Sequence, residues 1–79
     1  MQTTFHYYNN NSLLIVNAKG EIRILYTPFR VLCTKELQSI PLLTWVYVDE
    51  VCSTERDELI YVIYGQPYSY KSFRLKINF

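Results

Sequence analysis

Short strand-forming segments separated by turn residues are the feature that most restricts the fold of this chain. The segments recur at spacings of about eight to twelve residues, and β-branched and aromatic residues dominate them. Residues 44–51 and 58–64 contain no Gly or Pro, and apolar and polar residues alternate strictly over 73–79. Residues 34–41 are the only plausible helix, and Pro41 limits it to about two turns. The pattern therefore predicts an all-β fold.

A hairpin over residues 13–26 is the clearest local signal in the amino-terminal half. Its first strand is apolar, and Gly20 suits the left-handed position of a tight turn. Its second strand alternates, so that Ile22 and Ile24 share one face and Arg23 lies on the other. We expect the isoleucine face to be buried.

Closure into a barrel is the simplest way for so small a set of strands to cover its apolar face. We expect one domain over residues 1–79, an antiparallel barrel of about five to six strands. Residues 1–11 form either an extra edge strand or a frayed terminus, and 44–51 pairs with 58–64 as a hairpin. Two early strands, a long irregular connection, a hairpin and a last strand after a Gly-containing turn resemble the layout of an SH3-like barrel. The predicted core consists of Ile22, Ile24, Trp45, Val48, Ile63, Phe73, Leu75 and Ile77.

Charge and cysteine content point to a cytoplasmic protein. The formal net charge of +1 excludes a strong field for nucleic acid or for an anionic membrane. The amino-terminal residues lack the basic and apolar regions of a secretory signal, and the longest early apolar run is far too short to span a membrane. Cys33 and Cys52 are too far apart for a CxxC motif. We expect two reduced, unreactive thiols; a single disulfide between them is the alternative.

Catalytic and metal-binding motifs are absent from the sequence, so we expect a non-enzymatic protein without cofactor or metal. With only two glycines the chain offers no phosphate-binding loop, and His6 is its single histidine. Two acidic pairs, at residues 49–50 and 57–58, flank one hairpin loop. Because adjacent residues on a strand point to opposite faces, each pair is split, and a solvated hairpin end is the favoured interpretation.

Tyrosines are the most informative candidates for a binding site. Tyr64, Tyr68 and Tyr70 bracket the turn at residues 65–67, and Tyr47 lies on the neighbouring predicted strand. An aromatic surface of this kind docks a protein or peptide partner. The competing interpretation is that these rings fill a thin core and leave their hydroxyl groups in water.

Basic residues of the last segment give the alternative function. Lys71, Arg74 and Lys76 lie close to Tyr68 and Tyr70 in the sequence, and cations interleaved with rings are the elements of single-strand nucleic-acid binding. Three charges are few, so this reading predicts only weak binding. We expect a protein or peptide partner, no membrane, and either a monomer or a homodimer formed through an edge strand.

Overall fold

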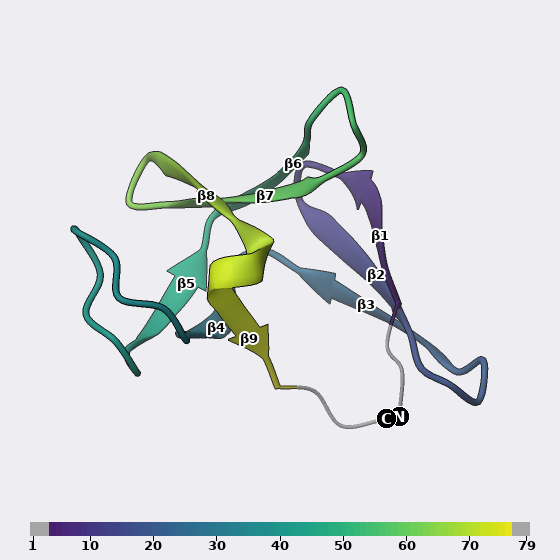
Figure 1. Cartoon of the computed structure of the whole chain (residues 1–79). Helices are drawn as coiled ribbons and strands as arrows, with labels where there is room; N and C mark the ends of the chain where they lie inside the picture. Colours follow the sequence, from purple (N-terminus) through teal and green to yellow (C-terminus); the bar gives the residue numbers. More distant parts are fainter. Residues whose placement is uncertain (1–3, 77–79) are drawn as a thin grey trace.

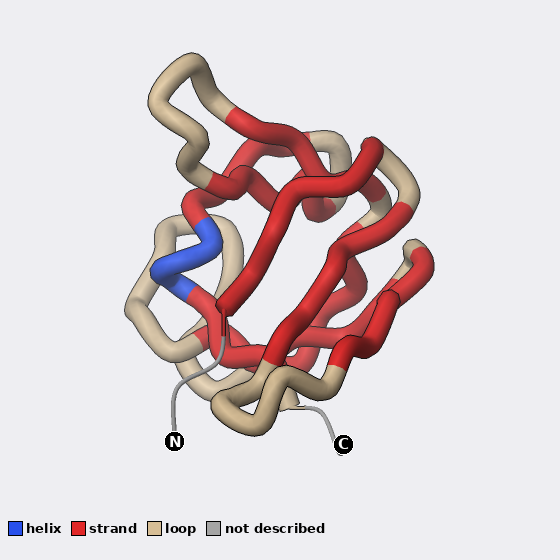
Figure 2. The backbone as a smooth tube through the Cα atoms, turned by 90° about the vertical axis from the view of Figure 1, so that its right-hand side faces the viewer, coloured by secondary structure: helices blue, strands red, loops and turns tan. Residues whose placement is uncertain are grey.

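Short antiparallel strands make up most of the chain. The structure is a computed structural model that describes residues 4–76, with side chains from residue 9 onward. Figure 2 shows that strands dominate the tube and that one helical turn lies among them. The elements are β1 (Thr4–Asn9), β2 (Ser12–Val16), β3 (Ile22–Tyr26), β4 (Phe29–Cys33), β5 (Trp45–Val48), β6 (Glu50–Ser53), β7 (Leu59–Ile63), β8 (Gln66–Ser69), the 3-10 turn η1 (Tyr70–Ser72) and β9 (Phe73–Leu75).

The first sheet is a meander in the order β1-β2-β3, which confirms the predicted hairpin between β2 and β3. Asn17 organises the turn between these two strands. Its Oδ1 accepts hydrogen bonds from the backbone N–H groups of Lys19 (3.0 Å) and Glu21 (2.9 Å), and its Nδ2 donates to Glu21 Oε1 (2.9 Å). Gly20 supplies the positive φ of 82° that the turn requires. The sheet therefore starts from a locally specified hairpin.

The predicted strand 44–51 is divided between two sheets. Its first part, β5, joins the sheet β5-β4-β9, and its second part, β6, joins the sheet β6-β7-β8 (Figure 1). Val46, Val48 and Val51 are all buried, so the inward alternation slips by one residue at Asp49–Glu50. The predicted pairing with 58–64 is therefore correct for β6, whereas β5 pairs with β4.

The all-β class is confirmed, but the strands number more than five or six because the longer predicted segments break. Across residues 4–76 the ladders form three separate sheets and no closed barrel. Single backbone bonds connect them: the N–H of Val51 in β6 donates to the carbonyl of Asn10 (2.9 Å), and the N–H of Asp49, between β5 and β6, donates to the carbonyl of Val62 in β7 (2.9 Å). The sheets thus surround one core without a continuous hydrogen-bonded wall.

The core draws on all three sheets, and Tyr61 lies at its centre. Its ring contacts Phe29 edge-on at 5.7 Å between centroids and Phe73 at 6.0 Å. The buried apolar side chains are Leu13, Ile15, Phe29, Val31, Cys33, Ile40, Val46, Val48, Val51, Leu59, Tyr61, Ile63 and Phe73. The predictions for Val48, Ile63 and Phe73 are confirmed, Leu75 is half-buried, and Ile77 lies outside the described residues.

Three core predictions are wrong, and the register of the strands explains why. Ile22 is 55% exposed and Ile24 38% exposed, because the buried side of β2 carries Leu13 and Ile15, which lie opposite Leu25 and Arg23. The isoleucines of β3 therefore point outward. Trp45 is 40% exposed because the buried residues of β5 are the two valines. Alternation defines two faces of a strand but does not say which one is inward.

Candidate functional site

The outer face of the sheet β5-β4-β9 carries exposed aromatic side chains. Val46 and Val48 point into the core, so Trp45 and Tyr47 point outward, with 40% and 58% of their surfaces exposed. The indole and the phenol stand two residues apart on one strand. Large rings left in water on one face are characteristic of surfaces that bind a partner.

Basic side chains from β4 and β9 stand beside these rings. Arg30 lies opposite Tyr47 in the β4–β5 ladder, and its guanidinium carbon is 4.6 Å from the centre of the Trp45 ring. This is a cation–π contact, which holds the indole and the guanidinium in a fixed relation. Arg74 faces outward from β9 on the other side of β4. Arg30, Trp45, Tyr47 and Arg74 therefore project from strands of one sheet rather than from a loop.

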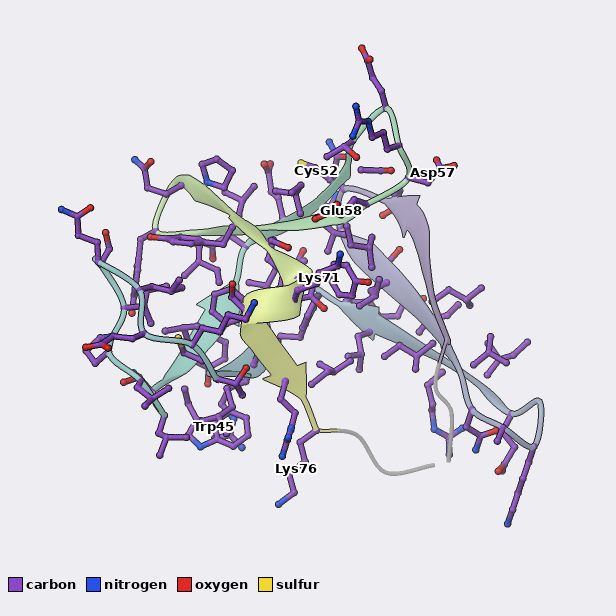
Figure 3. All side chains as sticks on the ribbon, in the orientation of Figure 1. Trp45, Cys52, Asp57, Glu58, Lys71 and Lys76 are labelled. Carbon is purple, nitrogen blue, oxygen red and sulfur yellow. The ribbon has the colours of Figure 1, made fainter. Side chains whose placement is uncertain are left out.

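The charges within the strands of this face have one sign. Strands β4, β5 and β9 contain Arg30 and Arg74 and no Asp or Glu; Lys76 follows directly after β9, and the exposed Asp49 follows directly after β5. We call Arg30, Trp45, Tyr47, Arg74 and Lys76 the basic aromatic face. In Figure 3, Trp45 and Lys76 lie at one end of the molecule, whereas Asp57 and Glu58 lie at the opposite end. The small net charge of the chain therefore hides a local separation of charges.

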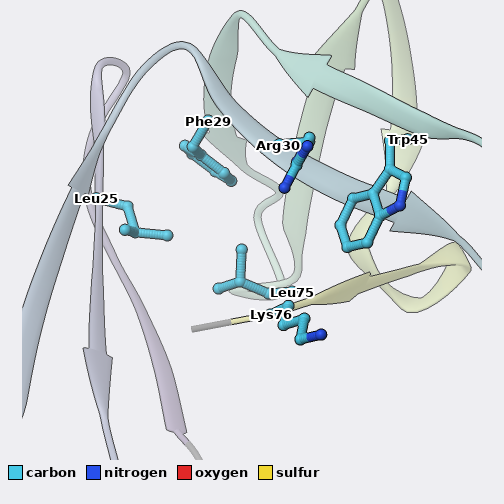
Figure 4. A pocket seen from close by; sticks show the side chains of 6 residues that line it. All are labelled: Leu25, Phe29, Arg30, Trp45, Leu75 and Lys76. Carbon is cyan, nitrogen blue, oxygen red and sulfur yellow. The ribbon is translucent and has the colours of Figure 1, made fainter. Parts of the chain in front are cut away.

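A pocket of about 390 Å³ opens beside the basic aromatic face. Its lining residues are Leu25, Phe29, Arg30, Trp45, Leu75 and Lys76. Figure 4 shows that Leu25 approaches from β3 of the first sheet. The other side chains come from the sheet β5-β4-β9 and from Lys76, the residue after β9. Four of the lining side chains are apolar or aromatic and two are cations, and polar atoms make up most of the surface of the pocket. It suits a ligand that places an apolar group inside and an anion at the rim.

The four tyrosines predicted as a binding surface do not share one surface. Tyr47 lies on the basic aromatic face, and Tyr64 is exposed at the β7–β8 turn with a positive φ of 54°. Tyr68 is half-buried and contacts Phe73 edge-on at 6.0 Å. Tyr70, in η1, also packs against the core. Tyr68 and Tyr70 therefore fit the interpretation of these rings as core and rim. Tyr47 and Tyr64 are exposed, but they lie on different parts of the surface.

The structure also separates the three basic residues predicted as a nucleic-acid site. Arg74 and Lys76 belong to the basic aromatic face, whereas Lys71 is exposed on η1, where its backbone N–H donates to Ser69 Oγ (3.3 Å). Sequence reasoning missed Arg30 and assigned Trp45 to the core. The signal for Arg30 was available, since the apolar residues at positions 29, 31 and 33 place it on the opposite face of β4.

Other polar groups are occupied in maintaining the fold. The acidic loop after β6 is arranged by Thr54, whose Oγ1 accepts from the N–H groups of Arg56 (3.2 Å) and Glu58 (3.1 Å). Glu58 in turn accepts a hydrogen bond from Ser69 Oγ at 3.2 Å. Within residues 4–76, no group of three His, Cys, Asp or Glu side chains is placed to hold a metal ion. Thr54 therefore orders this loop, and the Glu58 carboxylate ties it to β8.

The two cysteines are free thiols, as the sequence predicts. Cys33 is buried and donates a weak hydrogen bond to the carbonyl of Lys35 (3.0 Å), whereas Cys52 is half-buried.

In the core, burial and the neighbouring charge of Tyr70 raise the pKa of Tyr61 to about 12. Cys33 and Tyr61 therefore lie in the packed interior and have structural roles.

Comparison with known proteins yields no relative: no family model, curated protein or solved structure matches this chain. Among the described residues, no helix has the length and apolar character needed to cross a membrane. Function is therefore inferred from the side chains of the basic aromatic face and the pocket beside it.

Proposed function

We propose that the protein is a non-enzymatic interaction module that binds an acidic segment of a partner protein across the basic aromatic face. The observation that carries this proposal is the combination of exposed rings and cations on three strands that contain no carboxylate. Charge-assisted hydrogen bonds from arginine to a carboxylate orient the segment, and Trp45 and Tyr47 supply apolar contact area.

The pocket favours a peptide over other anionic partners. Leu25, Phe29 and Leu75 offer an apolar wall for one side chain of the segment, while Arg30 and Lys76 stand at the rim to pair with carboxylates on either side of it. The proposal thus narrows the predicted tyrosine surface to Tyr47 and adds the indole beside it. Tyr68 and Tyr70 contribute by supporting the core rather than by touching the partner.

We also propose that residues 29–76 have an SH3-like layout, preceded by the β1–β3 meander. In support, β4 is followed by a long irregular connection, the strand β5–β6 is shared between two sheets, and η1 leads into the last strand, which pairs with β4. The two unpaired thiols support a cytoplasmic location. The layout itself does not specify the partner, which is inferred from the side chains alone.

Single-stranded nucleic acid is the second candidate. The observation in its favour is that Arg30, Arg74 and Lys76 share a face with Trp45 and Tyr47, since cations interleaved with rings bind phosphates and stack bases. Three phosphate contacts support only weak, salt-sensitive binding. The apolar wall of the pocket contributes little to such a complex, so the peptide is favoured.

Matched substitutions test the proposal. A labelled peptide of alternating glutamate and leucine serves as probe, and its binding is followed by fluorescence anisotropy. We expect Arg30→Ala and Trp45→Ala each to weaken binding by more than about tenfold, in line with the behaviour of arginine and tryptophan anchors. Lys71→Ala and Tyr64→Ala alter an exposed cation and an exposed ring elsewhere and should change affinity less than about twofold. Equal effects of all four variants would refute the site.

A further inference from the structure

Strand β3 is an edge strand with an apolar outer face. In the part of the chain that the structure describes, it pairs with β2 on one side only. Ile22, Ile24 and Tyr26 are 55%, 38% and 69% exposed, and they lie beside the half-buried Leu14 and Val16 of β2. Natural edge strands usually carry outward charges or a proline against association with other chains. None of these three outward positions has that protection.

The backbone of the same three residues faces the free edge. Next to the strand ends, the N–H of Asn17 donates to the carbonyl of Glu21 (3.1 Å), and the N–H of Thr27 donates to that of Asn11 (2.9 Å). Bonding alternates residue by residue along an antiparallel ladder. The odd-numbered residues of β3 therefore bond to β2, and the N–H and C=O groups of Ile22, Ile24 and Tyr26 point away from the sheet.

We propose that β3 pairs antiparallel with β3 of a second copy of the chain, with Ile24 on the two-fold axis. In this register Ile24 lies opposite Ile24 of the partner subunit, and Ile22 lies opposite Tyr26 of the partner subunit. All the outward backbone groups of β3 then find partners, and the two meanders merge into one continuous sheet. An interface of this kind is isologous, so a single strand supplies both halves.

The charges select this register over its neighbours. With Ile24 on the axis, Arg23 lies opposite the partner's Leu25 and Glu21 opposite the partner's Thr27, so that no like charges are opposed. A shift that centres Arg23 sets two arginines against each other, which is destabilising. A shift that centres Leu25 leaves Ile22 without a partner. The sequence of β3 is therefore self-complementary in one register.

The size of the contact implies a reversible dimer. One strand pair and the side chains along it amount to a contact at the small end of protein interfaces, where association is weak and transient. The basic aromatic face lies on the sheet β5-β4-β9, away from the edge at which β3 would pair. Leu25 points to the inner side of the first sheet, so pairing through β3 leaves the pocket of each copy in place. The dimer would present two binding faces at once, which strengthens binding to a partner that has two acidic segments.

Analytical ultracentrifugation of the whole chain over micromolar to millimolar concentrations tests this association. We expect a concentration-dependent shift from monomer to dimer mass. Ile24→Lys, which opposes two lysines on the axis, should weaken the association by more than about tenfold. Leu42→Lys makes the same kind of change at a half-exposed leucine in the loop before β5 and should leave it unchanged. A monomer at every concentration, or equal effects of the two variants, would overturn the proposal.

Cross-linking tests the register directly. Residues opposite each other in a hydrogen-bonded pair have Cα atoms about 5.5 Å apart, within disulfide range. In a Cys52→Ser background, in which the other thiol is the buried Cys33, Ile24→Cys should oxidise to a covalent dimer. Tyr26→Cys should not do so alone but should cross-link when mixed with Ile22→Cys. A Tyr26→Cys homodimer that forms as readily as the Ile24→Cys dimer would exclude this register.

Discussion

Replacing Tyr61 by phenylalanine should abolish a specific loss of stability at alkaline pH. Burial, and secondly the charge of Tyr70, raise the pKa of Tyr61 from its ordinary value of 10.0 to about 12 in the folded state. The unfolded chain releases this proton first as the pH rises. The contribution of the protonated Tyr61 to the free energy of unfolding is therefore complete below pH 10 and is lost between about pH 10 and pH 12. A difference of about two pH units corresponds to about 2.7 kcal/mol.

Urea unfolding of the two proteins at several pH values from 8 to about 12 measures this effect. The phenylalanine variant keeps the ring that contacts Phe29 and Phe73, and every other residue is the same in both proteins. The difference between the two curves therefore isolates Tyr61. We expect the wild-type protein to lose about 2–3 kcal/mol more than the variant over this interval. Parallel curves would show that the hydroxyl of Tyr61 is not buried in the core.

Two further predictions concern stability. Ile63→Ala, at a fully buried position, should lower the free energy of unfolding by about 2–5 kcal/mol, whereas Ile22→Ala, at an exposed position, should lower it by less than about 1 kcal/mol. Similar shifts of the urea midpoint for the two variants would contradict the inward faces described above. Asn17→Ala leaves the N–H groups of Lys19 and Glu21 without their acceptor and should lower the free energy of unfolding by about 1–3 kcal/mol. An unchanged melting temperature would show that the turn forms without the Asn17 side chain.

Much of the fold can be predicted from the sequence because strand signals are local. The all-β class, the hairpin of β2 and β3, and the burial of Val48 and Ile63 depend on alternation, β-branched residues and a turn glycine. The division of the segment 44–51 between two sheets could not be read in the same way. Its inward side is set by what packs on each half, and the slip at Asp49–Glu50 leaves eight residues without a Gly or Pro to mark the break.

The candidate site was only partly predictable for a related reason. The sequence predicts Tyr47 in a tyrosine surface and Arg74 and Lys76 in an alternative nucleic-acid site, whereas Arg30 and Trp45 join them only through the pairing of β4 with β5. Contacts between strands that are distant in sequence depend on register, which no local pattern specifies here. Dependence on register also explains why the inward face of β3 was predicted wrongly. Its regular isoleucine face points to solvent because Leu13 and Ile15 of β2 fix the inner side of the sheet.

Fluorescence of the single tryptophan tests the proposed function most directly, because Trp45 lies in the basic aromatic face. The acidic glutamate–leucine peptide and a single-stranded oligonucleotide are titrated at two salt concentrations. We expect the peptide to change the emission of Trp45 in a saturable way and to retain measurable binding at physiological salt. Two results together would contradict the account. The first is an emission of Trp45 that does not change with peptide up to about 1 mM. The second is oligonucleotide binding whose log affinity falls with log salt at a slope near −2, as expected for about three phosphate contacts.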